Sequence, residues 1–251
     1  MLEVKTFPKD MSELEVDHTE PRRCLVSGLF EEPVEVNGQT RTFYTYIHPD
    51  LVYNQPCLVV APPDGMPVLD YLEQGPWLAF AKEHNIFLHV LIPGPGGWDL
   101  DGADADYMNR VYVQINGRRG YVAMQDNIYA VGVGGGSTVA QQAVMKMSSE
   151  WSGLATFGDL DARATLNAEA TAGGENTGKT ELVISAAKVQ VPVWMSWGEN
   201  AGVNARVCVY WKSMNDVADE AFSTSGRTRS ISPPTYAKRA RSTRKRSARF
   251  G

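Results

Sequence analysis

The chain has 251 residues, of which 43% are hydrophobic and 21% are charged, close to the average for globular proteins. This composition disfavours disordered, collagen-like and membrane-spanning classes, and the length suits one α/β domain with a sizeable core. Residues 1–17 lack the basic, apolar and small-residue order of a signal peptide, so we expect a cytoplasmic protein. The three cysteines are widely spaced and form no C-x-x-C motif, so we interpret them as reduced thiols; they are Cys24, Cys57 and Cys208.

Charge is distributed unevenly along the chain. Residues 227–251 hold nine Lys or Arg and no acid, whereas residues 1–226 hold 15 basic and 29 acidic side chains. We therefore divide the chain into an N-terminal extension (1–23), a globular domain (24–226) and a basic tail (227–251). The tail is expected to be disordered or foreign to the domain, as a reading-frame slip would make it. The alternative is a genuine tail that binds nucleic acid or membranes through its charge.

The first half of the domain alternates strand and helix patterns. In PVEVNGQTRTFYTYIHP, Asn37-Gly38 separates two alternating apolar runs, which is the signal of a type I′ β-hairpin. Residues 55–63 and 85–94 are short apolar runs that end in prolines, and residues 69–82 between them have helical spacing. Such alternation predicts a mostly parallel sheet with helices on both faces.

The second half continues this alternation. A helix is predicted from residue 103, with Asp104 or Asp106 placed to cap it. The stretch YAVGVGGGSTVAQQAV then indicates a buried strand, a tight glycine turn at residues 132–136, and a helix. Further strands are predicted at residues 152–159 and 189–200, and a last helix over residues 205–216.

Five segments together resemble one known family. They are RTFYTYIHP, CLVVAPPDG, NIYAVGVGGGSTVAQQ, VPVWMSWGEN and YWKSMN, in this order. Over residues 24–220 the sequence is similar to the polyhydroxybutyrate-depolymerase-like esterases of the α/β-hydrolase superfamily. The resemblance implies an α/β-hydrolase sheet with a further strand and a histidine beyond residue 226, where this chain has its basic tail.

The same resemblance locates the expected site. Family members carry a G-x-S-x-G nucleophile elbow, in which a strained turn presents a serine between strand and helix. Here the turn reads Gly-Val-Gly-Gly-Gly, so the serine position falls on Gly134. The resemblance implies oxyanion donors around Gly134 and Gly135 and an oxyanion loop at Pro63 and Asp64.

The other triad members are only partly represented. Ser137, three residues beyond Gly134, is a nucleophile if the elbow is shifted, or a small residue chosen for tight packing. Glu199 follows a predicted strand in the place of the acid, or is a solvated surface carboxylate. All four histidines, at positions 18, 48, 84 and 89, precede the elbow, and His89 is interpreted as a hydrogen-bonded core residue.

Two further motifs carry possible chemistry. Residues 173–180, GGENTGKT, match the phosphate-loop pattern, but the polar residues in front of them favour a surface loop. Asp99, Asp101, Asp104 and Asp106 could attract a cation, but they lack the EF-hand spacing and are better explained by helix capping. We predict no metal or cofactor.

These observations lead to two functional hypotheses. The first is a carboxylic-ester hydrolase of the depolymerase-like group whose chain lacks a recognisable Ser-His-acid triad. The second is a non-catalytic member that binds a small-molecule or polymeric ester ligand. In either case Trp98, Trp194, Trp197 and Trp211 are expected near the carboxyl ends of the strands, where open α/β sheets bind ligands.

Overall fold

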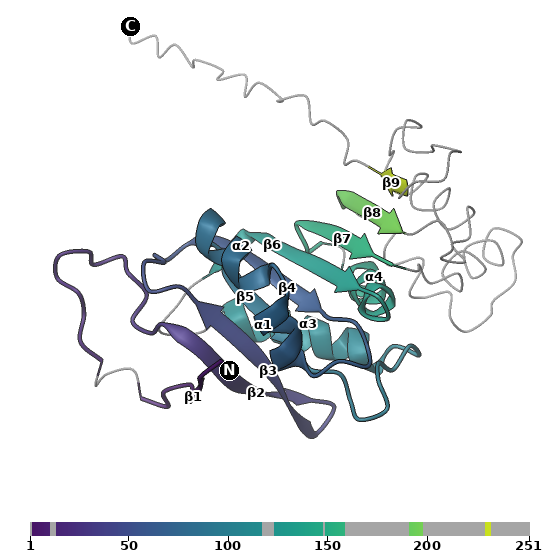
Figure 1. Cartoon of the computed structure of the whole chain (residues 1–251), viewed down its shortest axis with the longest axis horizontal. Coiled ribbons are helices and arrows are strands. Elements are labelled where there is room, and N and C mark those ends of the chain that lie inside the picture. The colour runs from purple at the N-terminus through teal and green to yellow at the C-terminus, as the bar shows by residue number, and fades with distance from the viewer. Residues whose placement is uncertain are drawn as a thin grey trace, which may run out of the picture.

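A computed structural model of the chain describes residues 2–10, 14–116, 123–147, 149–158, 191–197 and 229–231 (Figure 1). The helices are α1 (Val68–Gln74), α2 (Trp77–His84), α3 (Ala103–Asn116) and α4 (Gly136–Lys146). The strands are β1 (Val4–Thr6), β2 (Gly28–Val36), β3 (Gln39–Ile47), β4 (Gln55–Ala61), β5 (Phe87–Leu91), β6 (Ala123–Val133), β7 (Gly153–Phe157), β8 (Val193–Trp197) and β9 (Arg229–Ile231).

The described strands form one mixed sheet in the order β1-β2-β3-β5-β4-β6-β7-β8-β9. The strands β5, β4, β6, β7 and β8 run parallel to one another, which confirms the predicted parallel centre. The predicted hairpin is also confirmed: β2 and β3 pair antiparallel, and Asn37 and Gly38 both have positive φ, as a type I′ turn requires.

The helix predicted over residues 69–82 is wrong in one respect, because two helices replace it. Gly75 adopts an extended conformation, with φ −87° and ψ 172°, between α1 and α2. Pro76 follows it, and a proline disfavours helical geometry in the residue before it. The apolar spacing runs on through both helices, so periodicity alone does not reveal the break.

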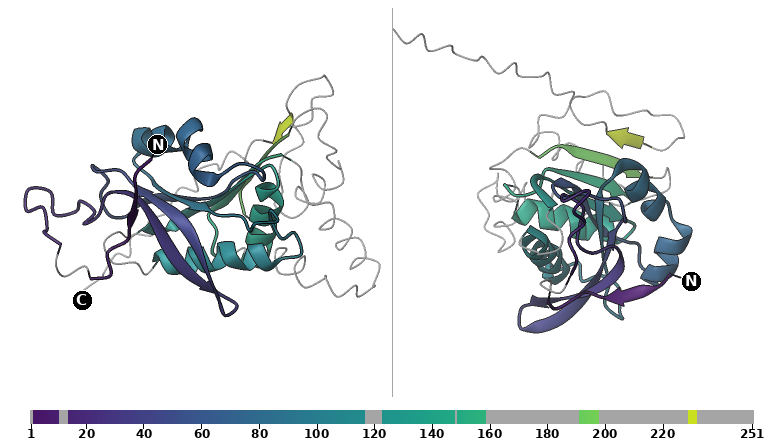
Figure 2. Two further views of the ribbon diagram at one scale, coloured as in Figure 1. Left: turned by 60° about the horizontal axis from the view of Figure 1, so that its bottom comes forward. Right: turned by 90° about the vertical axis from the view of Figure 1, so that its left-hand side faces the viewer.

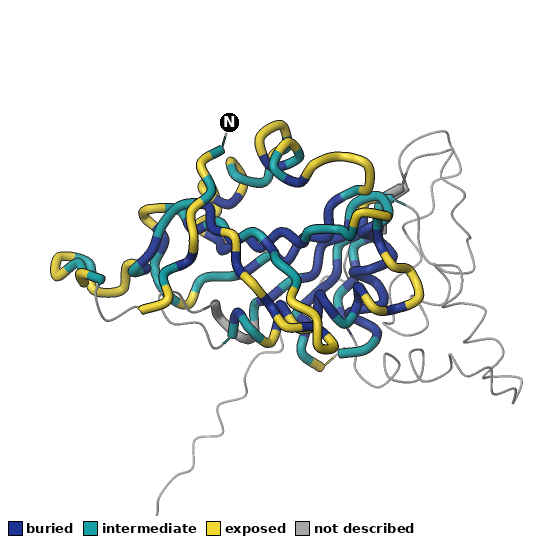
Figure 3. Tube along the Cα trace, turned by 90° about the horizontal axis from the view of Figure 1, so that it is seen from below, coloured by how far each residue is buried: buried dark blue, intermediate teal, exposed yellow. Residues whose placement is uncertain are grey.

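The helices cover both faces of the sheet (Figure 2). Residues of α3 and α4 pack with Phe43, Val59 and Ala130 in the larger apolar cluster, and residues of α1 and α2 pack with Val60 and Leu88 in the other. Buried residues therefore concentrate along the central strands (Figure 3). No helix in the described part is long and apolar enough to span a bilayer.

Both ends of the chain contribute strands to this sheet. Within the predicted extension, β1 pairs parallel with β2, and the ring of Phe7 packs edge-on against Phe30 at a centroid distance of 5.3 Å. Within the predicted tail, Arg229–Ile231 forms β9 and pairs antiparallel with β8. The rest of the tail lies outside the described residues, so the proposal that it is disordered or foreign stays a prediction.

The buried histidine of β5 confirms its predicted place in the core. The side chain of His89 is fully buried, and its Nδ1 is hydrogen-bonded to the hydroxyl of Thr45 at 2.9 Å. Because burial disfavours the charged imidazolium, the pKa of His89 is lowered from 6.5 to about 3. Cys24 and Cys57 are likewise buried, and both are free cysteines.

This lowered pKa makes the fold sensitive to acid. Below pH 6.5 the unfolded chain binds a proton at His89 that the folded chain does not, so stability present above pH 6.5 falls as the pH approaches 3. We expect a loss of about 2 kcal/mol at pH 5 relative to neutral pH. Urea unfolding at pH 7 and pH 5 measures this change in the free energy of unfolding. The variant His89→Gln should lose less stability over the same interval, and an equal loss in both proteins would contradict the assignment to His89.

Candidate functional site

The turn between β6 and α4 has the geometry of a nucleophile elbow. Gly134 lies at its apex with φ +56°, in the left-handed region that glycine adopts without strain. Its N–H donates to the carbonyl of Phe157 at the end of β7, at 2.9 Å, and its own carbonyl accepts from the N–H of Ser137 at 3.0 Å. The sequence therefore correctly predicted a strand, a tight turn and a helix.

Two flanking glycines let α4 approach the sheet closely. A Cβ on Gly136 would lie 2.1 Å from the carbonyl oxygen of Ala61, and a Cβ on Gly132 would lie 2.5 Å from the Cα of Ser137. Neither distance leaves room for a side chain, since both contacts are with backbone atoms. The glycine run thus specifies the packing of α4 against β4 and β6 as well as the turn itself.

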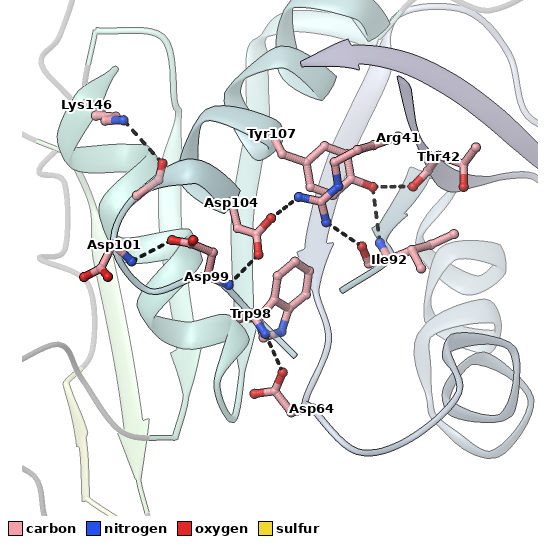
Figure 4. A network of polar contacts seen from close by, with 11 residues as sticks. Arg41, Thr42, Asp64, Ile92, Trp98, Asp99, Asp101, Asp104, Tyr107 and Lys146 are labelled. Carbon is pink, nitrogen blue, oxygen red and sulfur yellow. Dashed lines mark hydrogen bonds and ion pairs between the residues drawn. The ribbon is translucent and has the colours of Figure 1, made fainter. Parts of the chain in front are cut away.

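The loop after β4 places a carboxylate against the elbow. Asp64 Oδ1 accepts the backbone N–H of Trp98 at 3.0 Å (Figure 4). Its Oδ2 lies so near Gly135 that a Cβ there would be only 1.9 Å away. The indole N–H of Trp98 donates to the carbonyl of Pro62 at 2.8 Å, which ties the loops after β4 and β5 together. Gly135 must therefore remain without a side chain while Asp64 holds this position.

A polar network fixes the loop that carries Trp98 (Figure 4). The N–H of Asp99 donates to Asp104 Oδ2 at 2.6 Å, and the other oxygen of Asp104 is paired with Arg41. The guanidinium of Arg41 also donates to the carbonyl of Ile92 at 2.9 Å and lies 3.8 Å from the ring centre of Tyr107. This network links β3, the loop after β5 and the first turn of α3.

The acidic residues of this region serve in backbone hydrogen bonds and ion pairs. Asp106 is paired with Lys146 of α4 at 2.6 Å, and Asp99 accepts the N–H of Asp101 at 2.8 Å. Since α3 begins at Ala103, Asp104 and Asp106 lie in its first turn and neither occupies the predicted cap position. Within the described ranges, no group of three or more His, Cys, Asp or Glu could hold a metal ion.

The structure describes only one of the two predicted catalytic residues, Ser137. Ser137 is fully buried in the first turn of α4, and its hydroxyl has no hydrogen-bond partner among the described residues. Glu199 lies outside the described residues, as do Cys208, Trp211, the predicted helix 205–216 and the phosphate-loop match at 173–180. The roles of Ser137 and Glu199 therefore stay predictions.

Comparison with solved structures identifies the architecture. An S-formylglutathione hydrolase from Agrobacterium tumefaciens has a TM-score of 0.54 and 13% identity, with 75% of this chain and 83% of that chain covered. A lipase/esterase from Lactobacillus plantarum has a TM-score of 0.51 and 11% identity, with 76% and 86% covered. This chain has the α/β-hydrolase fold.

Further comparisons show no family for this chain. This chain spans 50% of the length of the pOPH chain in a complex with DMSO, at a TM-score of 0.43 and 16% identity. No family model matches the sequence, and no curated protein is significantly similar to it. The likeness of this chain to α/β hydrolases therefore lies in the fold.

Sequence reasoning missed what surrounds the elbow of this α/β-hydrolase fold. Exposed apolar side chains stand after β4, after β5 and at the end of β7; they are Met66, Leu100 and Phe157. Each is unremarkable in its own segment. Only the parallel sheet, which brings the carboxyl ends of its strands to one edge, places their segments around the same turn.

Proposed function

We propose that this hydrolase-fold protein binds an ester or related small molecule at the elbow without forming an acyl-enzyme. The observation that carries the proposal is Gly134, which occupies the apex of the turn at φ +56° and has no side chain. A hydrolase of this fold presents its nucleophile at that apex. Without a nucleophile the covalent route to ester hydrolysis has no first step.

The oxyanion loop supports the same proposal. Catalysis of acyl transfer requires backbone N–H groups directed at the oxygen that becomes negative. Pro62 and Pro63 have no N–H to donate, and the carboxylate of Asp64 lies against Gly135. A negative charge at this point opposes the development of a second one, so the loop disfavours an oxyanion.

The rim of the site supports ligand binding. Ligands of open α/β sheets bind outside the carboxyl ends of the strands. Met66, Leu100 and Phe157 lie in segments at this edge and are exposed, so they offer apolar surface that a ligand can remove from water. We therefore favour a ligand with an apolar part, such as a small ester or one unit of a polyester.

Hydrolysis through Ser137 is the competing function, and it makes a distinct prediction. Its hydroxyl is fully buried, so a substrate reaches it only if α4 moves away from the sheet. We expect no hydrolysis of nitrophenyl butyrate above the buffer rate and no labelling by a fluorophosphonate. Turnover that disappears in Ser137→Ala would overturn the non-catalytic proposal. Gly134→Ser tests the apex: a Cβ there would lie 3.1 Å from the Cβ and 3.4 Å from the Cα of Pro63, and the φ of +56° adds strain.

Binding itself is tested with benzyl acetate, followed by tryptophan fluorescence. We expect saturable binding that weakens about fivefold in Phe157→Ala, because the ligand loses apolar contact worth about 1 kcal/mol. The matched control is Phe80→Ala: Phe80 is 41% exposed and Phe157 is 42% exposed, but Phe80 lies on α2. Equal affinity in the two variants would place the ligand elsewhere.

A further inference from the structure

We infer that Asp64 makes the elbow site selective for ligands that carry a protonated amine and excludes those that carry a carboxylate. This inference rests on the ligand-binding function proposed above and names the class of ligand. It concerns the charge that a ligand meets when it approaches Gly134. The loop after β4 provides that charge, in the position where an active hydrolase needs hydrogen-bond donors.

The carboxylate of Asp64 is held in a defined orientation. The N–H of Trp98 fixes Oδ1 at 3.0 Å, and Oδ2 is in contact with the backbone at Gly135. Trp98 is itself held by its indole hydrogen bond to Pro62 and is 8% exposed. A carboxylate fixed in this way does not need to be ordered when a ligand binds, so less conformational entropy is lost.

No basic side chain in the described part of the chain neutralises Asp64. The two cations of the neighbouring network are engaged elsewhere, Arg41 with Asp104 and Lys146 with Asp106. Residues 1–226 also carry 29 acidic against 15 basic side chains, so the net charge of this part of the sequence has the same sign as Asp64. A ligand ammonium is therefore attracted to the elbow, whereas a ligand carboxylate meets like charge.

The apolar rim and the carboxylate together favour an amphipathic ligand, with one apolar part and one cationic part. An ammonium group supplies three N–H donors and can approach a carboxylate oxygen from several directions. An aromatic or aliphatic body attached to it can contact the exposed side chains of Met66, Leu100 and Phe157. The matching probes are benzylamine, benzyl alcohol and benzoate, which share one ring and differ in charge.

The experiment compares the affinities of these three probes at low ionic strength. We expect benzylamine to bind about two- to fivefold more tightly than benzyl alcohol, the range of an exposed ion pair, and benzoate to bind most weakly. The preference should diminish at high salt. In Asp64→Asn the amine and the alcohol should bind equally. The control Asp70→Asn, which removes an exposed carboxylate from α1, should keep the preference.

The outcomes separate this inference from the proposed function. If benzyl alcohol binds, Phe157→Ala weakens it, and Asp64→Asn leaves the ratio of amine to alcohol unchanged, the elbow binds ligands but Asp64 does not select their charge. If no probe is weakened by Phe157→Ala, the ligand-binding function fails as well. Equal amine preference in wild type and Asp64→Asn is the result that overturns the inference.

Discussion

Replacing Gly136 with alanine is expected to destabilise the fold by about 3 kcal/mol, near the upper end for overpacking. The added Cβ would lie 2.1 Å from the carbonyl oxygen of Ala61 and 2.7 Å from that of Pro62. Both are backbone atoms of the central sheet and its following loop, so neither can turn aside. Either α4 or β4 must shift.

The sign of this effect distinguishes packing from helix propensity. Gly136 is the first residue of α4, and alanine is favoured over glycine by about 1 kcal/mol inside helices, so propensity alone would not make alanine destabilising here. Urea unfolding at pH 7 gives the free energy of unfolding for both proteins. Gly96→Ala is the matched control, because a Cβ there has nothing within 4 Å. A stabilised Gly136→Ala protein would show that α4 does not lie this close to β4.

Replacing Arg41 with leucine is expected to cost about 3 kcal/mol, because it leaves a buried carboxylate without its cation. The side chain of Asp104 is only 4% exposed, and that of Arg41 is 23% exposed. Leucine keeps part of the packing against Tyr107 but removes the charge and the hydrogen bond to Ile92. The free energy of unfolding in urea measures the loss.

A double-mutant cycle assigns this loss to the pair. Asp104→Asn retains an oxygen for the N–H of Asp99 but carries no charge. The double variant Arg41→Leu/Asp104→Asn should therefore be more stable than Arg41→Leu alone, since no unpaired charge remains. If the losses in free energy of unfolding are additive, Arg41 contributes by packing and its charge does not stabilise the carboxylate of Asp104.

Local patterns predicted most elements because their causes are local. Asn37-Gly38 determines a type I′ turn by its own backbone preferences, and the glycines at 132–136 mark a tight bend whatever surrounds them. The helix over residues 69–82 was predicted less well, because an apolar stripe continues through the break at Gly75 and Pro76. Side-chain periodicity reports which face is buried, whereas the break depends on the backbone.

The residue types at the elbow were predicted more completely than the contacts between them. The family resemblance of the sequence predicted that Gly134 takes the nucleophile's position, and this stays a prediction. The sequence by itself shows that prolines precede Asp64. It did not show that the Asp64 carboxylate lies against Gly135, because these residues are 71 positions apart and meet only through the pairing of β4 with β6.

What the sequence determined, therefore, is the order of strands and helices, the shape of the turns and the absence of a side chain at position 134. The tertiary structure decided which loops share the elbow, that Ser137 is buried beneath it, and that Arg41 and Lys146 are already paired. The physical reason is that hydrophobic patterning is non-directional: it specifies that a segment is buried, but contact between distant polar groups depends on how the strands are ordered in the sheet.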